Sequence, residues 1–131
     1  MKTFTFLIVE DSESMRHFIK NILKELGFKD LMIASDGIEA KKILEESLQP
    51  ESTRIDLIFC DWMMPKMSGI EVLKEVRSNQ ALKDIPFVMI TTKKDPESIR
   101  QAIQEGVNDY VVKPFTANTL IEKVNKYTKK E

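Results

Sequence analysis

The strongest constraint on the fold is a regular alternation of two hydrophobic patterns along the chain. Five short, continuous apolar runs are separated by longer segments in which apolar residues recur at three- and four-residue intervals. A continuous apolar run of this length is typical of a strand buried on both faces of a parallel sheet. The three-and-four spacing is typical of an amphipathic helix. The sequence therefore predicts a doubly wound α/β fold of the (βα)5 type, with a five-stranded parallel sheet covered on both faces.

The expected elements have clear positions in the chain. The strands are expected at residues 4–9, 31–34, 55–60, 86–90 and 110–112, and the helices around residues 15–26, 40–48, 70–76, 99–103 and 120–124. Glycine commonly ends a helix, and Gly27 and Gly106 follow two of these segments. Helix starts are indicated by Asp36 with Glu39, by Ser68 with Glu71, and by Asp95 before Pro96. Only the loop at 49–54 looks extended.

Length and composition narrow the class of protein. A chain of 131 residues without repeats or linkers fits a single domain spanning residues 1–131, and a monomer is the default expectation. A net charge of −1 gives no reason to expect nucleic acid or an anionic membrane as partner. No apolar run approaches the roughly 18 residues of a membrane span, and the N-terminus lacks the features of a signal peptide. The Lys-rich ending at 126–131 is expected to be a natural terminus.

The single cysteine, Cys60, excludes an internal disulfide and favours a reducing, cytoplasmic location. It falls in a predicted strand, where we expect an inert, buried thiol. The single histidine, His17, falls on the polar side of the first helix and is expected at the surface, with a phosphate relay or a metal ligand as the alternative. Met63, Met64 and Met67 are expected to serve loop and core packing.

Polar residues mark the carboxyl ends of the predicted strands. Glu10 and Asp11 follow the first run, Asp61 the third, Thr91 the fourth and Lys113 the fifth. Right-handed crossovers place these ends on one edge of the sheet, where ligands of open α/β folds bind. If the first and third strands are neighbours, three carboxylates meet there and repel one another unless a cation lies among them. Mg²⁺ is the cation that such oxygen ligands favour.

The same set of residues indicates phosphoryl chemistry. A carboxylate beside Mg²⁺ can act as a nucleophile toward phosphorus, which makes Asp61 a candidate for an aspartyl-phosphate. The phosphoryl oxygens then need hydrogen-bond donors, and Thr91 offers a hydroxyl while Lys113 offers a mobile ammonium. Asp61, Thr91 and Lys113 are therefore the predicted catalytic residues.

This ordered set resembles response-regulator receiver domains, and among them the stand-alone, CheY-like receivers of chemotaxis. The resemblance extends over nearly the whole chain, and it is carried by Glu10-Asp11, Asp61-Trp62, Met64-Pro65, Gly69, Thr91 and the run NDYVVKPF at 108–115. It implies the flavodoxin-like strand order 2-1-3-4-5, which belongs to the family and does not follow from the residue pattern. It also implies a cis peptide bond between Lys113 and Pro114.

The resemblance implies a role for each site residue. Asp61 accepts phosphate from a CheA-like histidine kinase, and Mg²⁺ is held by Glu10, Asp11, Asp61 and the backbone carbonyl of Met63. Thr91 and Lys113 contact the phosphoryl group, and Thr91 and Tyr110 act as the switch. The partner-binding surface is formed by the fourth helix, the fifth strand and the fifth helix, with Lys94, Ile99, Ile103, Tyr110 and Lys123.

The resemblance also implies the working partners. Besides the kinase, they are an output protein, which in chemotaxis is the flagellar motor switch, and a phosphatase. Such a domain catalyses its own phosphorylation and dephosphorylation without turning over small substrates. Phosphorylation then shifts the population between inactive and active conformers. Glu10, Met63, Thr92 and Lys93 depart from the usual pattern, and we expect them to tune the phosphoryl lifetime.

Other functions fit parts of the pattern. A haloacid-dehalogenase-like phosphatase also uses a strand-end Asp, but it usually needs a second acid where this chain has Met63. A phosphorylation-independent adaptor would keep the fold and the partner surface alone. A phosphorelay intermediate and a receiver cut from a longer DNA-binding regulator are further alternatives. Trp62 beside the site is expected to report metal or phosphate binding by its fluorescence.

Overall fold

The computed structural model describes residues 4–128. They form a five-stranded parallel sheet of order β2-β1-β3-β4-β5, which confirms the expected fold class and strand order. The strands are β1 Thr5–Val9, β2 Asp30–Ala34, β3 Leu57–Asp61, β4 Phe87–Thr91 and β5 Asp109–Val112. The helices are α1 Glu13–Glu25, α2 Gly37–Glu46, α3 Gly69–Ser78, α4 Pro96–Gln104 and α5 Ala117–Thr128. The last three residues of the expected terminus at 126–131 lie outside the described residues.

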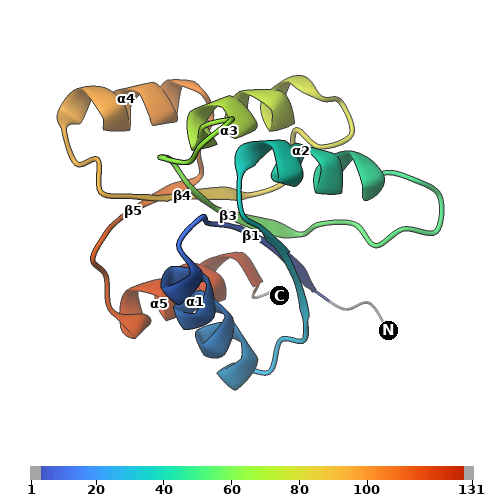
Figure 1. Cartoon of the computed structure of the whole chain (residues 1–131), viewed down its shortest axis with the longest axis horizontal. Helices are drawn as coiled ribbons and strands as arrows, with labels where there is room; N and C mark the ends of the chain where they lie inside the picture. Colours follow the sequence, from blue (N-terminus) through green and yellow to red (C-terminus); the bar gives the residue numbers. More distant parts are fainter. Residues whose placement is uncertain (1–3, 129–131) are drawn as a thin grey trace.

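The sheet is covered on both faces (Figure 1). Helices α1 and α5 pack on one face, and α2, α3 and α4 lie on the other. Alternate strand residues enter the two cores: Phe6 and Ile8 face α1 and α5, whereas Leu7 and Val9 belong to the core under α2 and α3. Both faces of each central strand are buried, so these strands are apolar except at an end residue, and this explains the continuous apolar runs in the sequence.

The ends of the helices agree largely with the sequence. Gly27 and Gly106 adopt positive φ angles of 98° and 95°, as expected for residues that end a helix. Ser68 and Glu71 form a complete capping box at the start of α3. Asp95 caps α4, and Pro96 occupies its first turn.

The start of α2 differs from the expectation. Asp36 caps the helix by accepting a 2.8 Å hydrogen bond from the Glu39 backbone N–H. The Glu39 carboxylate does not return this bond to Asp36. It accepts hydrogen bonds from the backbone N–H and the hydroxyl of Ser35, at 2.8 and 3.0 Å. The return bond of a capping box is therefore made with Ser35, one residue before the cap, because Ser35 supplies two donors to the Glu39 carboxylate.

The bounds of β3 matter for the site. Asp61 is the last residue of this strand rather than the first of a loop, and it pairs with Ile90 of β4. The next residue, Trp62, still donates its backbone N–H to the Ile90 carbonyl at 3.3 Å. The backbone on both sides of the Asp61 side chain is therefore held by the sheet. Within residues 4–128, no helix has the length and apolar character needed to cross a membrane.

Candidate functional site

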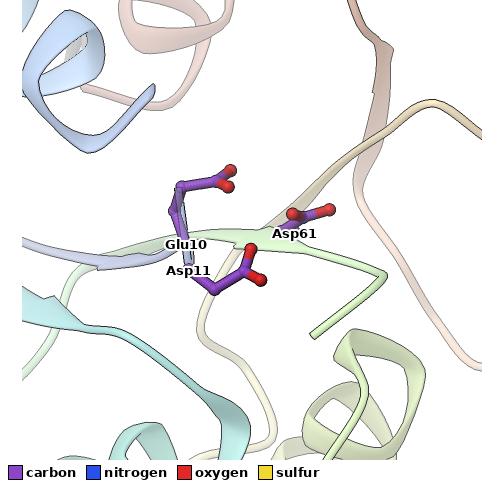
Figure 2. A group of neighbouring side chains, drawn as sticks. All are labelled: Glu10, Asp11 and Asp61. Atoms are coloured by element: carbon purple, nitrogen blue, oxygen red, sulfur yellow. The ribbon is translucent and has the colours of Figure 1, made fainter. Parts of the chain in front are cut away.

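Three carboxylates meet at the carboxyl edge of the sheet. Glu10 and Asp11 directly follow β1, and Asp61 ends the adjacent strand β3 (Figure 2). The register pairs Val9 of β1 with Cys60 of β3. Glu10 and Asp61 are the residues that directly follow this pair, so they lie beside each other. One carboxylate oxygen from each of the three residues lies within 4.8 Å of the other two. The convergence expected from the sequence is therefore present.

The three acids differ in their exposure to solvent. Glu10 and Asp61 are buried, with 1% and 5% of their surface exposed, whereas Asp11 is exposed. Lys113 approaches both buried acids: its Nζ lies 3.0 Å from Glu10 Oε1 and 3.1 Å from Asp61 Oδ2. The Lys113–Pro114 bond is cis, as the resemblance implied. Lys113 therefore reaches the site, where its ammonium is shared by two carboxylates.

Burial and neighbouring charges shift the pKa values of two site residues, Glu10 and Lys113. Burial and the nearby charge of Asp61 raise the pKa of Glu10 to about 7, because its hydrogen bonds with Lys113 and Ser12 offset only part of the cost. Burial alone would lower the pKa of Lys113, but the hydrogen bond and charges of Glu10 and Asp61 outweigh it and raise that pKa. Glu10 thus exchanges its proton near neutral pH, while Lys113 stays charged.

The predicted switch residues are connected through Lys93. The Lys93 backbone N–H donates to Thr91 Oγ1 at 3.0 Å, and the Tyr110 hydroxyl donates to the Lys93 carbonyl at 2.6 Å. The Lys93 ammonium lies 5.5 Å from the centre of the Trp62 ring. The Trp62 and Tyr110 rings pack edge to face, with 6.5 Å between their centroids. Thr91 is fully buried at the end of β4. Lys93, in the loop after β4, therefore contacts Thr91, Tyr110 and Trp62.

The predicted partner-binding residues lie on α4, β5 and α5 or on the loop before α4. Lys94 and Ile103 are exposed, Ile103 by 62%, and Ile99 and Tyr110 are half-buried. Lys123 is engaged within the chain, because its Nζ lies 2.8 Å from Asp109 Oδ1. The exposed apolar side chain of Ile103 on α4 and the exposed Lys94 in the loop before α4 suit a protein-binding surface. The ion pair with Asp109 limits what Lys123 can offer a partner.

An open cleft of about 430 Å³ adjoins the carboxylates. Its lining residues are Asp11, Trp62, Met63, Met64, Pro65, Ser68 and Lys93. Met64 and Met67 pack against the core as expected. The packing expected for Met63 was wrong: its side chain is 57% exposed, because it projects from the loop that leaves β3. The Met63 backbone lies beside the site, since its N–H donates to Asp61 Oδ1 at 3.3 Å.

The only histidine and the only cysteine of the chain, His17 and Cys60, lie where we expected them. His17 is exposed on α1, with its Nε2 3.9 Å from Glu13. Cys60 is fully buried, and burial together with the charges of Asp61 and Glu10 raises the pKa of its thiol well above the usual value. The thiol stays protonated and inert.

Two contacts at the site were missed in the sequence. Arg16 on α1 donates from Nη1 to the Glu10 carbonyl at 2.8 Å. The Ser12 backbone N–H donates to Glu10 Oε2 at 3.1 Å. Both contacts hold the turn that carries Glu10 and Asp11. Serine as the cap of α1 was a usable signal for the turn, but nothing in the local pattern pointed to Arg16.

The sheet and this edge together define a doubly wound α/β domain with an acidic, lysine-bridged site at its strand ends. The response regulator receiver domain family matches residues 6–125, so the chain belongs to this family and is the receiver domain of a CheY-like response regulator. It is 43% identical over 125 residues to the chemotaxis protein CheY-3 of Vibrio cholerae, covering 95% of this chain and 92% of that protein.

Solved structures agree with this assignment. The chemotaxis protein CheY4 of Vibrio cholerae superposes with a TM-score of 0.84 at 31% identity, covering 96% of this chain and 99% of that one. The receiver domain of the sensor histidine kinase PA1611 of Pseudomonas aeruginosa has a magnesium ion coordinated in its active site cleft. It superposes with a TM-score of 0.82 at 26% identity, covering 96% of this chain and 98% of that one.

Proposed function

We propose that this chain is a phosphorylation switch made of a single receiver domain. Asp61 accepts a phosphoryl group from a histidine kinase in a Mg²⁺-dependent reaction, and the modified domain changes its affinity for a protein target. One observation carries the proposal: Lys113 bridges Glu10 and Asp61 at 3.0 and 3.1 Å, inside a cluster of three carboxylates. Acid, cation site and ammonium are the groups that this chemistry requires.

The donor set fits a magnesium ion. Glu10, Asp11 and Asp61 each offer a carboxylate oxygen, and the resemblance adds the backbone carbonyl of Met63. When bound, Mg²⁺ neutralises these acids and draws charge from the phosphoryl oxygens. The magnesium in the PA1611 receiver domain supports this part of the proposal. Glu10 replaces the commoner Asp, so its longer arm either reaches the ion directly or holds it through water.

The residues of this chain then have separate tasks. An Asp61 carboxylate oxygen forms a bond to phosphorus while the phosphorus–nitrogen bond of the donor phosphohistidine breaks. The released imidazole nitrogen keeps the electron pair and takes a proton from solvent. Lys113, already 3.1 Å from Asp61 Oδ2, moves its charge onto the new phosphoryl oxygens. Thr91 gives up the Lys93 N–H and donates its hydroxyl proton to the same group.

The switch follows from the contacts around Lys93. If Thr91 turns toward the phosphoryl group, the Lys93 N–H loses its acceptor, and the carbonyl bonded to Tyr110 is displaced with it. Tyr110 changes rotamer, and the surface of α4, β5 and α5 changes shape. The target would read this surface through Lys94, Ile99, Ile103, Tyr110 and Lys123.

The proposed setting is chemotaxis in the cytoplasm. The similarity to chemotaxis proteins of Vibrio cholerae supports this setting. The kinase would be CheA-like, the target the flagellar motor switch protein, and a phosphatase would shorten the signal. A phosphorelay with another receiver or phosphotransfer domain is the alternative setting for the same chemistry.

Intact-mass spectrometry tests the chemistry. The protein is incubated with acetyl phosphate, with and without Mg²⁺, beside an Asp61→Asn control. We expect a gain of one phosphate that requires Mg²⁺ and is absent from the control. The absence of any adduct under rapid acid quench, which traps short-lived acyl phosphates, would refute the switch and favour a phosphorylation-independent adaptor.

A further inference from the structure

The loop between β3 and α3, residues 62–68, is closed at its base against Asp61. The Gly69 backbone N–H donates to the Trp62 carbonyl at 2.8 Å. A Cβ atom at Gly69 would lie only 2.1 Å from the Asp61 carbonyl oxygen, so no other residue fits this close approach. Within the loop, the Met63 N–H reaches the Asp61 carboxylate. The conformation of this loop is thus tied to the proposed phosphorylation site.

The far side of the same loop touches the start of α2. A Cβ atom at Gly37 would lie 2.2 Å from the Met67 carbonyl oxygen and 2.6 Å from the Met67 Cβ. Real Cβ atoms do not come closer than 3.0 Å, and the neighbour here is backbone, which cannot move aside cheaply. Gly37 does not have a positive φ angle. The contact therefore requires glycine for space and not for its backbone conformation.

Neighbouring residues reinforce this contact. Lys66 Nζ lies 3.5 Å from Asp36 Oδ2, and Asp36 is the residue that caps α2. The Met67 N–H donates to the Pro65 carbonyl at 2.7 Å in a tight turn, which places Lys66 at a φ of 71°. The Met67 side chain packs against the core. The loop is thereby held between α2 on one side and Asp61 on the other.

We propose that Gly37 is a positioning residue for the acidic site. By admitting the Met67 carbonyl, Gly37 sets the loop 62–68, and the loop sets the Met63 backbone beside Asp61. This inference rests on the proposed function, because the cation is the group that the loop helps to hold. It makes α2, which contributes no side chain to the carboxylate cluster, part of the site's framework.

A purely helical role for Gly37 predicts a different outcome. Gly37 is the first residue of α2, and alanine is at least as good as glycine in a helix. Gly37→Ala would then leave cation binding unchanged and leave stability unchanged or increased. The positioning role instead predicts weaker binding of Mg²⁺, because the added Cβ forces the loop and the Met63 backbone away from their places.

The first test compares Mg²⁺ affinity in wild type and Gly37→Ala, using the fluorescence of Trp62, the only tryptophan. We expect the Kd for Mg²⁺ to rise at least about fivefold. Phosphorylation by acetyl phosphate should slow at limiting Mg²⁺ and recover at saturating Mg²⁺. Val76→Ala, a change in the buried face of α3, is the matched control for loss of stability and should keep the wild-type Kd.

Distinct outcomes separate this inference from the proposed function. A wild type that binds Mg²⁺, beside a Gly37→Ala protein whose Kd is within twofold, overturns the positioning role alone. The same holds if Val76→Ala weakens binding equally. A wild type that binds no Mg²⁺ overturns both proposals. If Gly37→Ala does not fold, the test uses wild-type amide NMR spectra: Mg²⁺ should shift the amides of Gly37 and Ile38, and unshifted amides overturn the inference.

Discussion

Lys113 Nζ lies 3.0 Å from Glu10 Oε1 and 3.1 Å from Asp61 Oδ2, so that one ammonium bridges acids from two adjacent strands. The ammonium compensates buried charge that would otherwise be unpaired, at the point where the proposed chemistry needs a nucleophile. The contact joins the two ends of the chain, because Lys113 follows β5 while Glu10 follows β1. The state of this site is therefore coupled to the stability of the whole sheet.

Removing the ammonium should destabilise the protein in a pH-dependent manner. We expect Lys113→Met to lower the free energy of unfolding by about 2 kcal/mol at pH 8, because two buried carboxylates lose their shared partner. The loss should shrink at pH 5, where Glu10 takes up a proton. Urea denaturation without divalent cations measures both values. Lys94→Met, at an exposed lysine, should stay within about 0.5 kcal/mol of wild type. If Lys113→Met lost the same stability at pH 8 and at pH 5, the proton uptake assigned to Glu10 would be contradicted.

Glu10 should make the metal-free protein less stable as the pH rises. Its pKa in the folded state is raised from 4.5 to about 7, so the folded state binds the proton more tightly than the unfolded state. The protonated Glu10 therefore stabilises the folded state at low pH. As the pH rises from about 4.5 to about 7, the free energy of unfolding should fall by about 2 kcal/mol. Glu10→Gln should flatten that part of the stability profile, measured by urea denaturation from pH 4.5 to pH 8.

Mg²⁺ provides the complementary measurement. A bound cation favours the ionised form of Glu10, so Mg²⁺ binding should release a proton and strengthen as the pH rises through about 7. Calorimetric titrations in two buffers of different ionisation enthalpy detect this release. Proton release that persists in Glu10→Gln would show that another group is responsible.

Asp109 should stabilise the fold above acidic pH. Although burial opposes ionisation, hydrogen bonds from Lys123, Tyr127 and Lys126 lower the pKa of Asp109 from 3.8 to about 2. This stabilisation is present above about pH 4 and is lost as the pH falls toward 2. Asp109→Asn should therefore cost about 1 kcal/mol at pH 7, with the difference narrowing between pH 4 and pH 2.5. Thermal unfolding of wild type and Asp109→Asn across this pH range measures the difference in stability. A difference that does not change with pH would contradict the lowered pKa of Asp109.

Arg77 should be essential to the edge of the sheet opposite the acidic site. Its guanidinium donates to the carbonyls of Lys83, Ile85 and Gly106 and to Asn108 Oδ1, at 2.7 to 3.1 Å. We expect Arg77→Met to cost about 2 kcal/mol of unfolding free energy. Arg77→Lys should recover little, because an ammonium cannot span these acceptors as a planar fork does.

Chemical denaturation measures the stability of both Arg77 variants. Their Mg²⁺ affinity should match that of wild type, since the network lies at the other end of the strands. A full recovery of stability by Arg77→Lys would show that charge alone, without the forked geometry, is sufficient.

Local patterns predicted most of the fold because they depend on neighbouring residues. The apolar runs located all five strands within a few residues, and Ser68 with Glu71 formed the expected capping box. The bounds were less accurate at β3, where the predicted strand stopped one residue short of Asp61. We expected the strand to stop before the first polar residue. Asp61 instead remains part of the strand, as its last residue, because its backbone pairs with Ile90 of β4.

Long-range contacts were harder to predict. The strand order came from a family resemblance and not from the residue pattern. The sequence placed Lys113 at the acidic edge but did not show that Glu10 would share it with Asp61. The contacts of Arg16 with the Glu10 carbonyl and of Gly37 with Met67 left no local signal. Each depends on where two separate segments meet.

The sequence by itself determined the alternation of strands and helices and the kinds of chemical group at the strand ends. Hydrophobic periodicity and residue type are local properties, so these features can be read without the fold. Only the tertiary structure decided that Glu10 is buried, that Lys113 bridges it to Asp61, and that Gly37 supports the loop beside them. Burial, charge coupling and close packing arise from atoms far apart in the chain, and they exist only once the sheet and its covering helices have assembled.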